Sequence, residues 1–297
     1  MRFGKRFSLL LVALFALVLS AAACGEEEPA GSDGAAEEES SEGEQDFTLV
    51  EEGVLTVGSD IPYPPFEFEE AGELAGFDVE IVREVGDRLG LENPDDAWIS
   101  TDFGTIFQQL ASGSQFDVVA AAVTGYAPDG SPAAETVADR TAVVDFTIPF
   151  YPSLQSLTVD TEASPDITGV DSLPEGARVG VQRATTGAFY AQENLTGAEL
   201  VSFEKAPQMY QQLQAGQLDA VFNDLPVTID SIEDKPALEV VEQVETGEEY
   251  AIAVSKDNPG LTEAINGALE EMFADGTFAE IYSTYFPEQE LPEYASE

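Results

Sequence analysis

Residues 108–119 read QQLASGSQFDVV, and a similar order of residues, QQLQAGQLDAV, returns at 211–221. In each copy a helical segment ends at a glycine, Gly113 or Gly216, and an apolar strand with aspartate at its second position follows. Because glycine commonly follows a helix, a coincidence between two ordinary helix–strand units is one explanation. The other is that the chain contains two similar units, each a strand and helix repeat.

The segments around these copies continue the alternation of strands and helices. The first series has strands at 54–57 and 116–123 and helices at 78–89 and 103–111. Asp78 is the expected cap of the first helix. The second series has strands at 178–182 and 218–222 and helices at 185–194 and 207–215, and two helices, 259–275 and 277–286, end the chain. Short apolar strands that alternate with helices predict an α/β protein with mainly parallel sheets.

The N-terminus has the features of an export signal. Basic residues precede an apolar run at 9–19, and small residues at 20–23 lead to Cys24, the only cysteine. The run is too short to span a bilayer, so 1–23 is predicted to be a signal peptide. Cys24 is in the position of the lipidated cysteine of a bacterial lipoprotein. An uncleaved anchor, or a secreted protein with a free thiol, are the alternatives.

The acidic segment at 24–46 is rich in Glu, Gly, Ser and Ala and has no basic residue, which predicts a disordered tether. The body that follows, about 250 residues, is long enough for two domains. The whole chain carries a net charge of −47, which disfavours binding to nucleic acid or to an anionic membrane surface. We interpret the acidity as halophilic adaptation to high salt rather than as a device for attracting a cationic ligand.

The chain lacks the residues of several catalytic classes. It has no histidine and a single cysteine, so no His/Cys metal site and no Ser–His or Cys–His nucleophile is expected. No glycine-rich phosphate loop is present. The composition favours binding over catalysis, and no cofactor is predicted.

Three motifs near the start of the body resemble a known family. They are LTVGSD at 55–60, YPPFEF at 63–68 and GFDVE at 76–80. Further matches follow in order, including VDFT at 144–147, VGVQ at 179–182 and DGT at 275–277. The collinear series covers 54–287 and is similar to the polar amino-acid-binding proteins, family 3 of the bacterial extracellular solute-binding proteins.

The resemblance implies a type II periplasmic-binding-protein fold, in which two α/β lobes close on a ligand. Lobe 1 would comprise 47–150 and 253–297, lobe 2 would comprise 156–246, and the hinge crossings would be 151–155 and 247–252.

The resemblance also implies ten ligand-binding residues. Arg140 would grip an α-carboxylate, and Asp224 would pair with an α-ammonium. Thr124, Thr185 and Thr186 would assist at the carboxylate, and the Ala122 carbonyl would accept from the ammonium. Tyr63 and Phe103 would hold the ligand side chain, and Asp60 and Gln182 would lie at its far end. The competing roles are a surface ion pair for Arg140, helix capping for Thr185, Thr186 and Asp224, and core packing for the aromatic residues.

Two departures from the family pattern affect this assignment. An insert, 125–139, separates Thr124 from Arg140 and suggests a loop at the cleft edge or on the back of lobe 1. Ala184 replaces a glycine of the family, and would be strained if that glycine has a positive φ.

The predicted function is that of an extracytoplasmic, lipid-anchored receptor that binds an amino acid or similar zwitterion. It would act as a monomer and deliver the ligand to an ABC-importer permease. The alternatives are an enzyme on the same fold, of the cyclohexadienyl or arogenate dehydratase type, and a sensory ligand-binding module.

Overall fold

The computed structural model describes residues 47–113 and 115–295. The predictions for the signal peptide, Cys24 and the acidic tether therefore fall outside the described residues. Within the described part of the chain, no helix has the length and apolar character needed to cross a membrane.

The first sheet, called sheet A, has five short strands in the order β4-β1-β5-β13-β7. Its strands are β1 (Val57–Ser59), β4 (Trp98–Ser100), β5 (Val118–Val119), β7 (Val144–Phe146) and β13 (Ala253–Ser255). Strand β1 runs parallel to β4 and β5, whereas β13 is antiparallel to β5 and β7. The parallel strands are the ones joined by helices, as the alternation in the sequence predicts.

The second sheet, called sheet B, has six strands in the order β10-β9-β11-β8-β12-β6. They are β6 (Thr124–Tyr126), β8 (Tyr151–Asp160), β9 (Arg178–Gln182), β10 (Glu199–Phe203), β11 (Ala220–Asp224) and β12 (Leu238–Tyr250). Strand β9 is parallel to β10 and β11, and the remaining pairs are antiparallel. Both sheets are therefore mixed.

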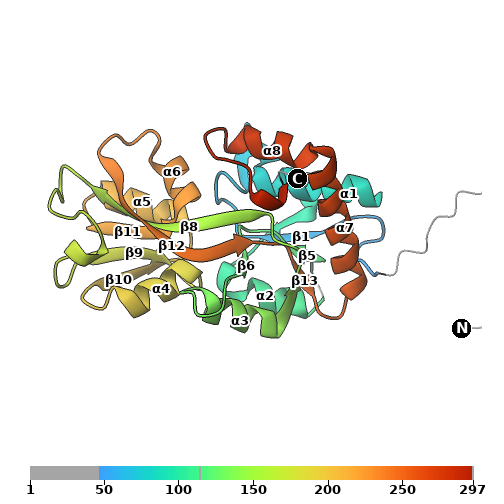
Figure 1. The fold of residues 1–297 in the computed structure, drawn as a ribbon, viewed down its shortest axis with the longest axis horizontal. Coiled ribbons are helices and arrows are strands. Elements are labelled where there is room, and N and C mark those ends of the chain that lie inside the picture. The colour runs from blue at the N-terminus through green and yellow to red at the C-terminus, as the bar shows by residue number, and fades with distance from the viewer. Residues whose placement is uncertain (1–46, 114, 296–297) are drawn as a thin grey trace, which may run out of the picture. The chain divides into compact units, whose positions relative to one another are not determined.

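Helices cover the two sheets separately (Figure 1). Helices α1 (Phe77–Leu89), α2 (Phe103–Ala111), α7 (Pro259–Asp275) and α8 (Thr277–Tyr285) accompany sheet A, and α4 (Thr186–Asn194), α5 (Ala206–Gln214) and α6 (Leu225–Ile232) accompany sheet B. Helix α3 (Ala134–Val143) packs on α2, β6 and β7. The strands β2 (Phe68–Glu70) and β3 (Glu73–Ala75) form a separate hairpin.

Two long strands, β8 and β12, run beside each other between the two groups of elements (Figure 1). They pair from Asp160 and Leu238 at one end to Tyr151 and Tyr250 at the other, with register shifts at Val240/Glu242 and Val244/Glu248. Aromatic side chains pack where these strands meet the elements of sheet A. Tyr151 and Tyr250 stack with their ring centroids 5.5 Å apart, and Phe66 contacts both rings.

The structure confirms the predicted α/β class and the positions of most helices, with α2 and α7 at the predicted bounds. Two local predictions are wrong. The expected strand 116–123 is interrupted, because Ala122 has a φ of 47° and turns the backbone between β5 and β6. Asp78 is not the cap of α1: Gly76 occupies that position, and the Asp78 side chain is buried.

Candidate functional site

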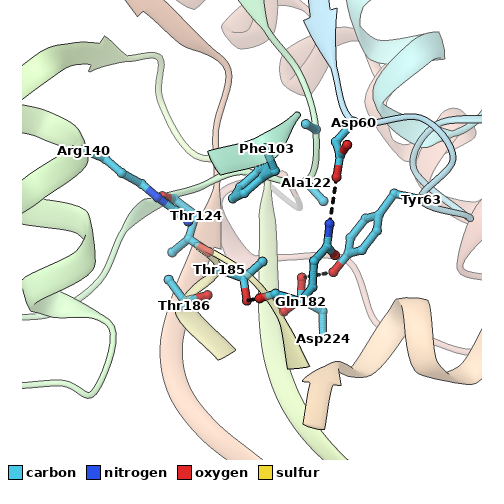
Figure 2. Close-up of a pocket in the computed structure, with 11 residues that line it drawn as sticks. Asp60, Tyr63, Phe103, Ala122, Thr124, Arg140, Gln182, Thr185, Thr186 and Asp224 are labelled. Atoms are coloured by element: carbon cyan, nitrogen blue, oxygen red, sulfur yellow. Dashed lines mark hydrogen bonds between the residues drawn. The ribbon is translucent and has the colours of Figure 1, made fainter. Parts of the chain in front are cut away.

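One pocket brings together all ten residues that the sequence predicts for a ligand site (Figure 2). It is lined by Asp60, Tyr63, Phe103, Ala121, Ala122, Thr124, Arg140, Gln182, Thr185, Thr186 and Asp224. Ala121 is the only lining residue that the prediction omits. The pocket therefore combines residues of the sheet A elements with residues of the sheet B elements.

Strand and helix ends bring the polar lining residues to the pocket. Asp60 follows β1 directly, Gln182 ends β9 and Asp224 ends β11, so the carboxyl ends of three strands contribute side chains, as in other open α/β sheets. Thr185 caps α4, where its hydroxyl accepts a hydrogen bond from the Ala188 N–H at 3.1 Å. Capping and lining of the pocket therefore coexist at Thr185.

Arg140 is buried in the pocket, with an exposed fraction of 6%. It lies on α3, so the predicted loop at 125–139 is wrong for its second half, where the chain is helical from Ala134 onward. Its guanidinium donates to the Thr124 carbonyl at 2.8 Å and to the Ala184 carbonyl at 3.4 Å. It also lies 5.3 Å from the Phe103 ring centroid. Burial lowers the pKa of Arg140 to about 10, although the negative charges of Glu248 and Asp224 oppose that shift.

Asp224 is the second buried charge of the pocket. Its carboxylate accepts hydrogen bonds from the hydroxyls of Tyr63 and Tyr250, both at 2.7 Å, and from the Gln155 amide. Although Asp224 occupies the N-cap position of α6, its side chain makes no capping hydrogen bond, so the capping alternative is not supported. Burial raises the pKa of Asp224, and the three donors and Arg140 counteract that rise.

Glu248 is a further buried acid, which the sequence reasoning missed. It lies on β12, is 2% exposed, and accepts a hydrogen bond from the Gln155 amide at 2.9 Å. Burial, followed by the charge of Asp224, raises its pKa to about 7. Its neighbours Thr246 and Tyr250 are buried as well, but a register shift between Val244 and Glu248 breaks the regular alternation of β12, so the sequence pattern gave no clear signal.

The opposite end of the pocket is formed by Asp60, which is 2% exposed. One carboxylate oxygen accepts from the Gln182 amide at 2.7 Å, and the other accepts from the ammonium of Lys205. Burial raises the pKa of Asp60 to about 6, and Lys205 limits the rise. Sequence reasoning missed Lys205, although lysine is rare in this chain and this one directly precedes a helix, where a positive charge is unfavourable.

Two alanines have backbone conformations that are uncommon for residues with a side chain: Ala122, which lines the pocket, and Ala184, whose carbonyl accepts from Arg140. Ala122 has a φ of 47°, and its N–H donates to the Asp78 carboxylate at 2.8 Å. Ala184 has a φ of 63°, as expected where the sequence departs from a family glycine. Both positions thus have a positive φ although neither is a glycine.

The described residues contain no group of three or more His, Cys, Asp or Glu side chains that could hold a metal ion. The chemistry that the pocket offers is hydrogen bonding and charge pairing. The buried Arg140 and Asp224 lie on one side, and the Asp60 carboxylate lies at the other end. Aromatic rings line the space between them.

A two-lobed α/β protein with a polar pocket between its sheets is the class that the fold and the site define. The chain belongs to the bacterial extracellular solute-binding proteins, family 3, whose family model matches residues 55–288.

Relatives with known roles are similar over most of the chain. The L-cystine-binding protein TcyJ of Escherichia coli K12 is 29% identical, over 80% of this chain and 84% of its own. The ABC transporter glutamine-binding protein GlnH of Bacillus subtilis 168 is 26% identical, over 96% of this chain and 98% of its own. A solved structure of an ancestral arginine-binding protein bound to arginine has 32% identity and a TM-score of 0.70, and it covers 79% of this chain and 98% of that one. The two-lobed periplasmic-binding-protein fold is thereby confirmed.

Proposed function

We propose that this protein binds a free amino acid in the pocket and presents it to the permease of an ABC importer. The buried guanidinium of Arg140 carries the proposal. Its partners in the described part of the chain are two main-chain carbonyl oxygens and aromatic rings, and none of the ion pairs there includes it. A buried positive charge is costly without an anion, and a planar guanidinium suits a carboxylate.

The α-carboxylate of the ligand would bind Arg140 and the N–H groups at the start of α4. The α-ammonium would bind Asp224 and the Ala122 carbonyl. Tyr63 and Phe103 would flank the side chain, with Asp60 and Gln182 at its far end. This arrangement explains why one small pocket buries both a cation and an anion.

The relatives support delivery to an importer, since they are named as binding proteins, one of them of an ABC transporter. Binding without chemical conversion is part of the proposal. The body would act as a monomer outside the cytoplasm, held to the membrane by a lipid on Cys24. Cys24→Ser should then release the protein from the membrane or retain it only as the uncleaved precursor, and cleaved protein that stays on the membrane in this variant would argue against the anchor.

Isothermal titration calorimetry of the purified protein with a panel of L-amino acids tests the central proposal. We expect saturable binding of at least one, with recovery of the unchanged ligand afterwards. Binding of none, or conversion of the ligand during incubation, would refute it.

A further inference from the structure

At the far end of the pocket, Lys205 neutralises the negative charge of Asp60. This end therefore differs from a site that offers a carboxylate alone. Lys205 directly precedes α5 and reaches from the sheet B side to the sheet A side. Its ammonium donates to the Asp60 carboxylate and to the Ile61 carbonyl at 2.9 Å. The N-terminus of α5 disfavours a positive charge, so these two acceptors account for its position.

Two other acids, Asp102 and Glu67, act on the charges at this end of the pocket. Asp102, whose charge acts on Asp60, pairs with Arg183. Glu67 is completely buried, and burial, followed by the charges of Asp78 and Asp60, raises its pKa well above the usual range, which favours its uncharged form. The two carboxylates at this end that are ion-paired in the described part of the chain, Asp60 and Asp102, therefore each already have a cationic partner.

Hydrogen-bond acceptors nevertheless remain at this end. The Gln182 amide nitrogen donates to Asp60 and to the Glu204 carbonyl, which fixes the orientation of the amide. Its oxygen is buried and has no partner among the described residues. A buried acceptor of this kind needs an N–H or O–H donor.

We infer that the ligand's side chain is an uncharged donor of the carboxamide class, and that Lys205 excludes cationic side chains. This inference rests on the proposed function. A carboxamide offers two N–H groups without charge, which matches the Gln182 oxygen and the remaining lone pairs of Asp60. A guanidinium or ammonium would find the same acceptors but would lie beside the Lys205 ammonium, which is paired with Asp60. Selectivity therefore comes from repulsion by the Lys205 ammonium as well as from hydrogen bonds to Gln182 and Asp60.

The test compares the affinities of L-glutamine and L-arginine for the wild type, Lys205→Met and Lys256→Met. Methionine keeps most of the lysine stem and removes the charge, and Lys256, which is half-exposed and pairs with Asp145, is the control. The wild type should prefer glutamine by at least about tenfold, and Lys205→Met should shift the ratio toward arginine by about 10- to 100-fold. Lys256→Met should leave the ratio unchanged.

Each other outcome has one meaning. Preference of the wild type for arginine, or an unchanged ratio in folded Lys205→Met, overturns the inference but leaves the proposed function intact. Binding of no amino acid overturns both. Should Lys205→Met fail to fold, the wild-type ratio still decides, and Lys205→Arg, which keeps the charge, should retain the wild-type preference.

Discussion

The Asp78 carboxylate accepts a hydrogen bond from the N–H of Ala122 at 2.8 Å and thereby holds the turn that forms one wall of the pocket. Ala122 has a positive φ there, which costs conformational energy for a residue with a side chain. The buried carboxylate, on the first turn of α1, supplies the acceptor that keeps this turn in place.

Replacing Asp78 should separate the role of its acceptor from the role of its charge. Asp78→Asn keeps an oxygen acceptor, whereas Asp78→Leu leaves the Ala122 N–H without one. We expect Asp78→Leu to be less stable than Asp78→Asn by about 1–3 kcal/mol and to bind ligand more weakly. Urea unfolding and calorimetry measure both effects, with Asp87→Ala, exposed on the same helix, as a control. Equal behaviour of the two Asp78 variants would show that the hydrogen bond does not hold the turn.

Glu248 should make the stability of the ligand-free protein depend on pH. Its pKa is raised from 4.5 to about 7 in the folded state, so folding favours its protonated form. The stabilising contribution is complete below about pH 4.5 and is lost as the pH rises through about 7. Between pH 5 and pH 8, the free energy of unfolding should therefore fall by about 2–3 kcal/mol more in the wild type than in Glu248→Gln.

Urea denaturation at the two pH values measures this difference. Asp60 and Asp78 also have raised pKa values, about 6 and about 7, and add a fall of the same sign that persists in Glu248→Gln. Glu239→Gln, exposed on the same strand, should behave like the wild type. An identical pH dependence in Glu248→Gln would show that Glu248 does not titrate in this range.

The two buried charges of the pocket should each be necessary for binding. Removing either leaves the other, and one end of a zwitterion, without a partner, which costs about 3–5 kcal/mol. Micromolar binding corresponds to about −8 kcal/mol, so Arg140→Ala and Asp224→Ala should bind barely detectably. Calorimetry with the best wild-type ligand measures this, and Arg83→Ala, which loses only partly exposed ion pairs, should bind normally. Near-normal affinity in Arg140→Ala would show that another residue anchors the carboxylate.

The sequence predicts those site residues that local structure places. Asp60, Gln182 and Asp224 lie at the ends of strands, and Thr185 starts a helix, so their positions follow once the strands and helices are known. Glu248 and Lys205 were missed because their roles depend on which face of β12 is buried and on which segments meet across the pocket. The sequence alone shows neither which face of β12 is buried nor which segments meet across the pocket.

The insert at 125–139 shows a different limit of structure prediction from the sequence. Its glycine, proline and aspartate residues indicate a loop, yet its second half belongs to α3, where only Thr136 and Arg140 are buried. A helix with so small a buried face has a weak apolar period, so tertiary contacts with α2, β6 and β7 decide its structure.

The net charge of −47 should make the stability of the protein depend on salt. Charges that repel across the surface are screened over about 10 Å at 0.1 M salt and about 3 Å at 1 M. We expect the melting temperature to rise between 0.1 M and 1 M NaCl at constant pH, as followed by circular dichroism. A flat or falling melting temperature would contradict the interpretation of the acidic surface as an adaptation to salt.

Ligand binding should close the two lobes. Several contacts join the sheet A side to the sheet B side across the pocket: Tyr63 with Asp224, Asp60 with Gln182 and Lys205, and Asp102 with Arg183. An opening motion would break these contacts and separate Arg140 from Asp224. A ligand that needs both charges must therefore favour the closed state. We expect 151–155 and 247–252, the ends of the paired strands β8 and β12 near the pocket, to absorb the motion.

Small-angle X-ray scattering with and without saturating ligand measures this closure. The radius of gyration should fall in the wild type and remain unchanged in Arg140→Ala at the same ligand concentration, because the variant cannot hold the α-carboxylate. A ligand-free protein that is open in solution and keeps its radius of gyration on saturation would contradict closure. An importer could then not distinguish the loaded receptor from the empty one by the arrangement of its lobes, and recognition would have to depend on the ligand itself.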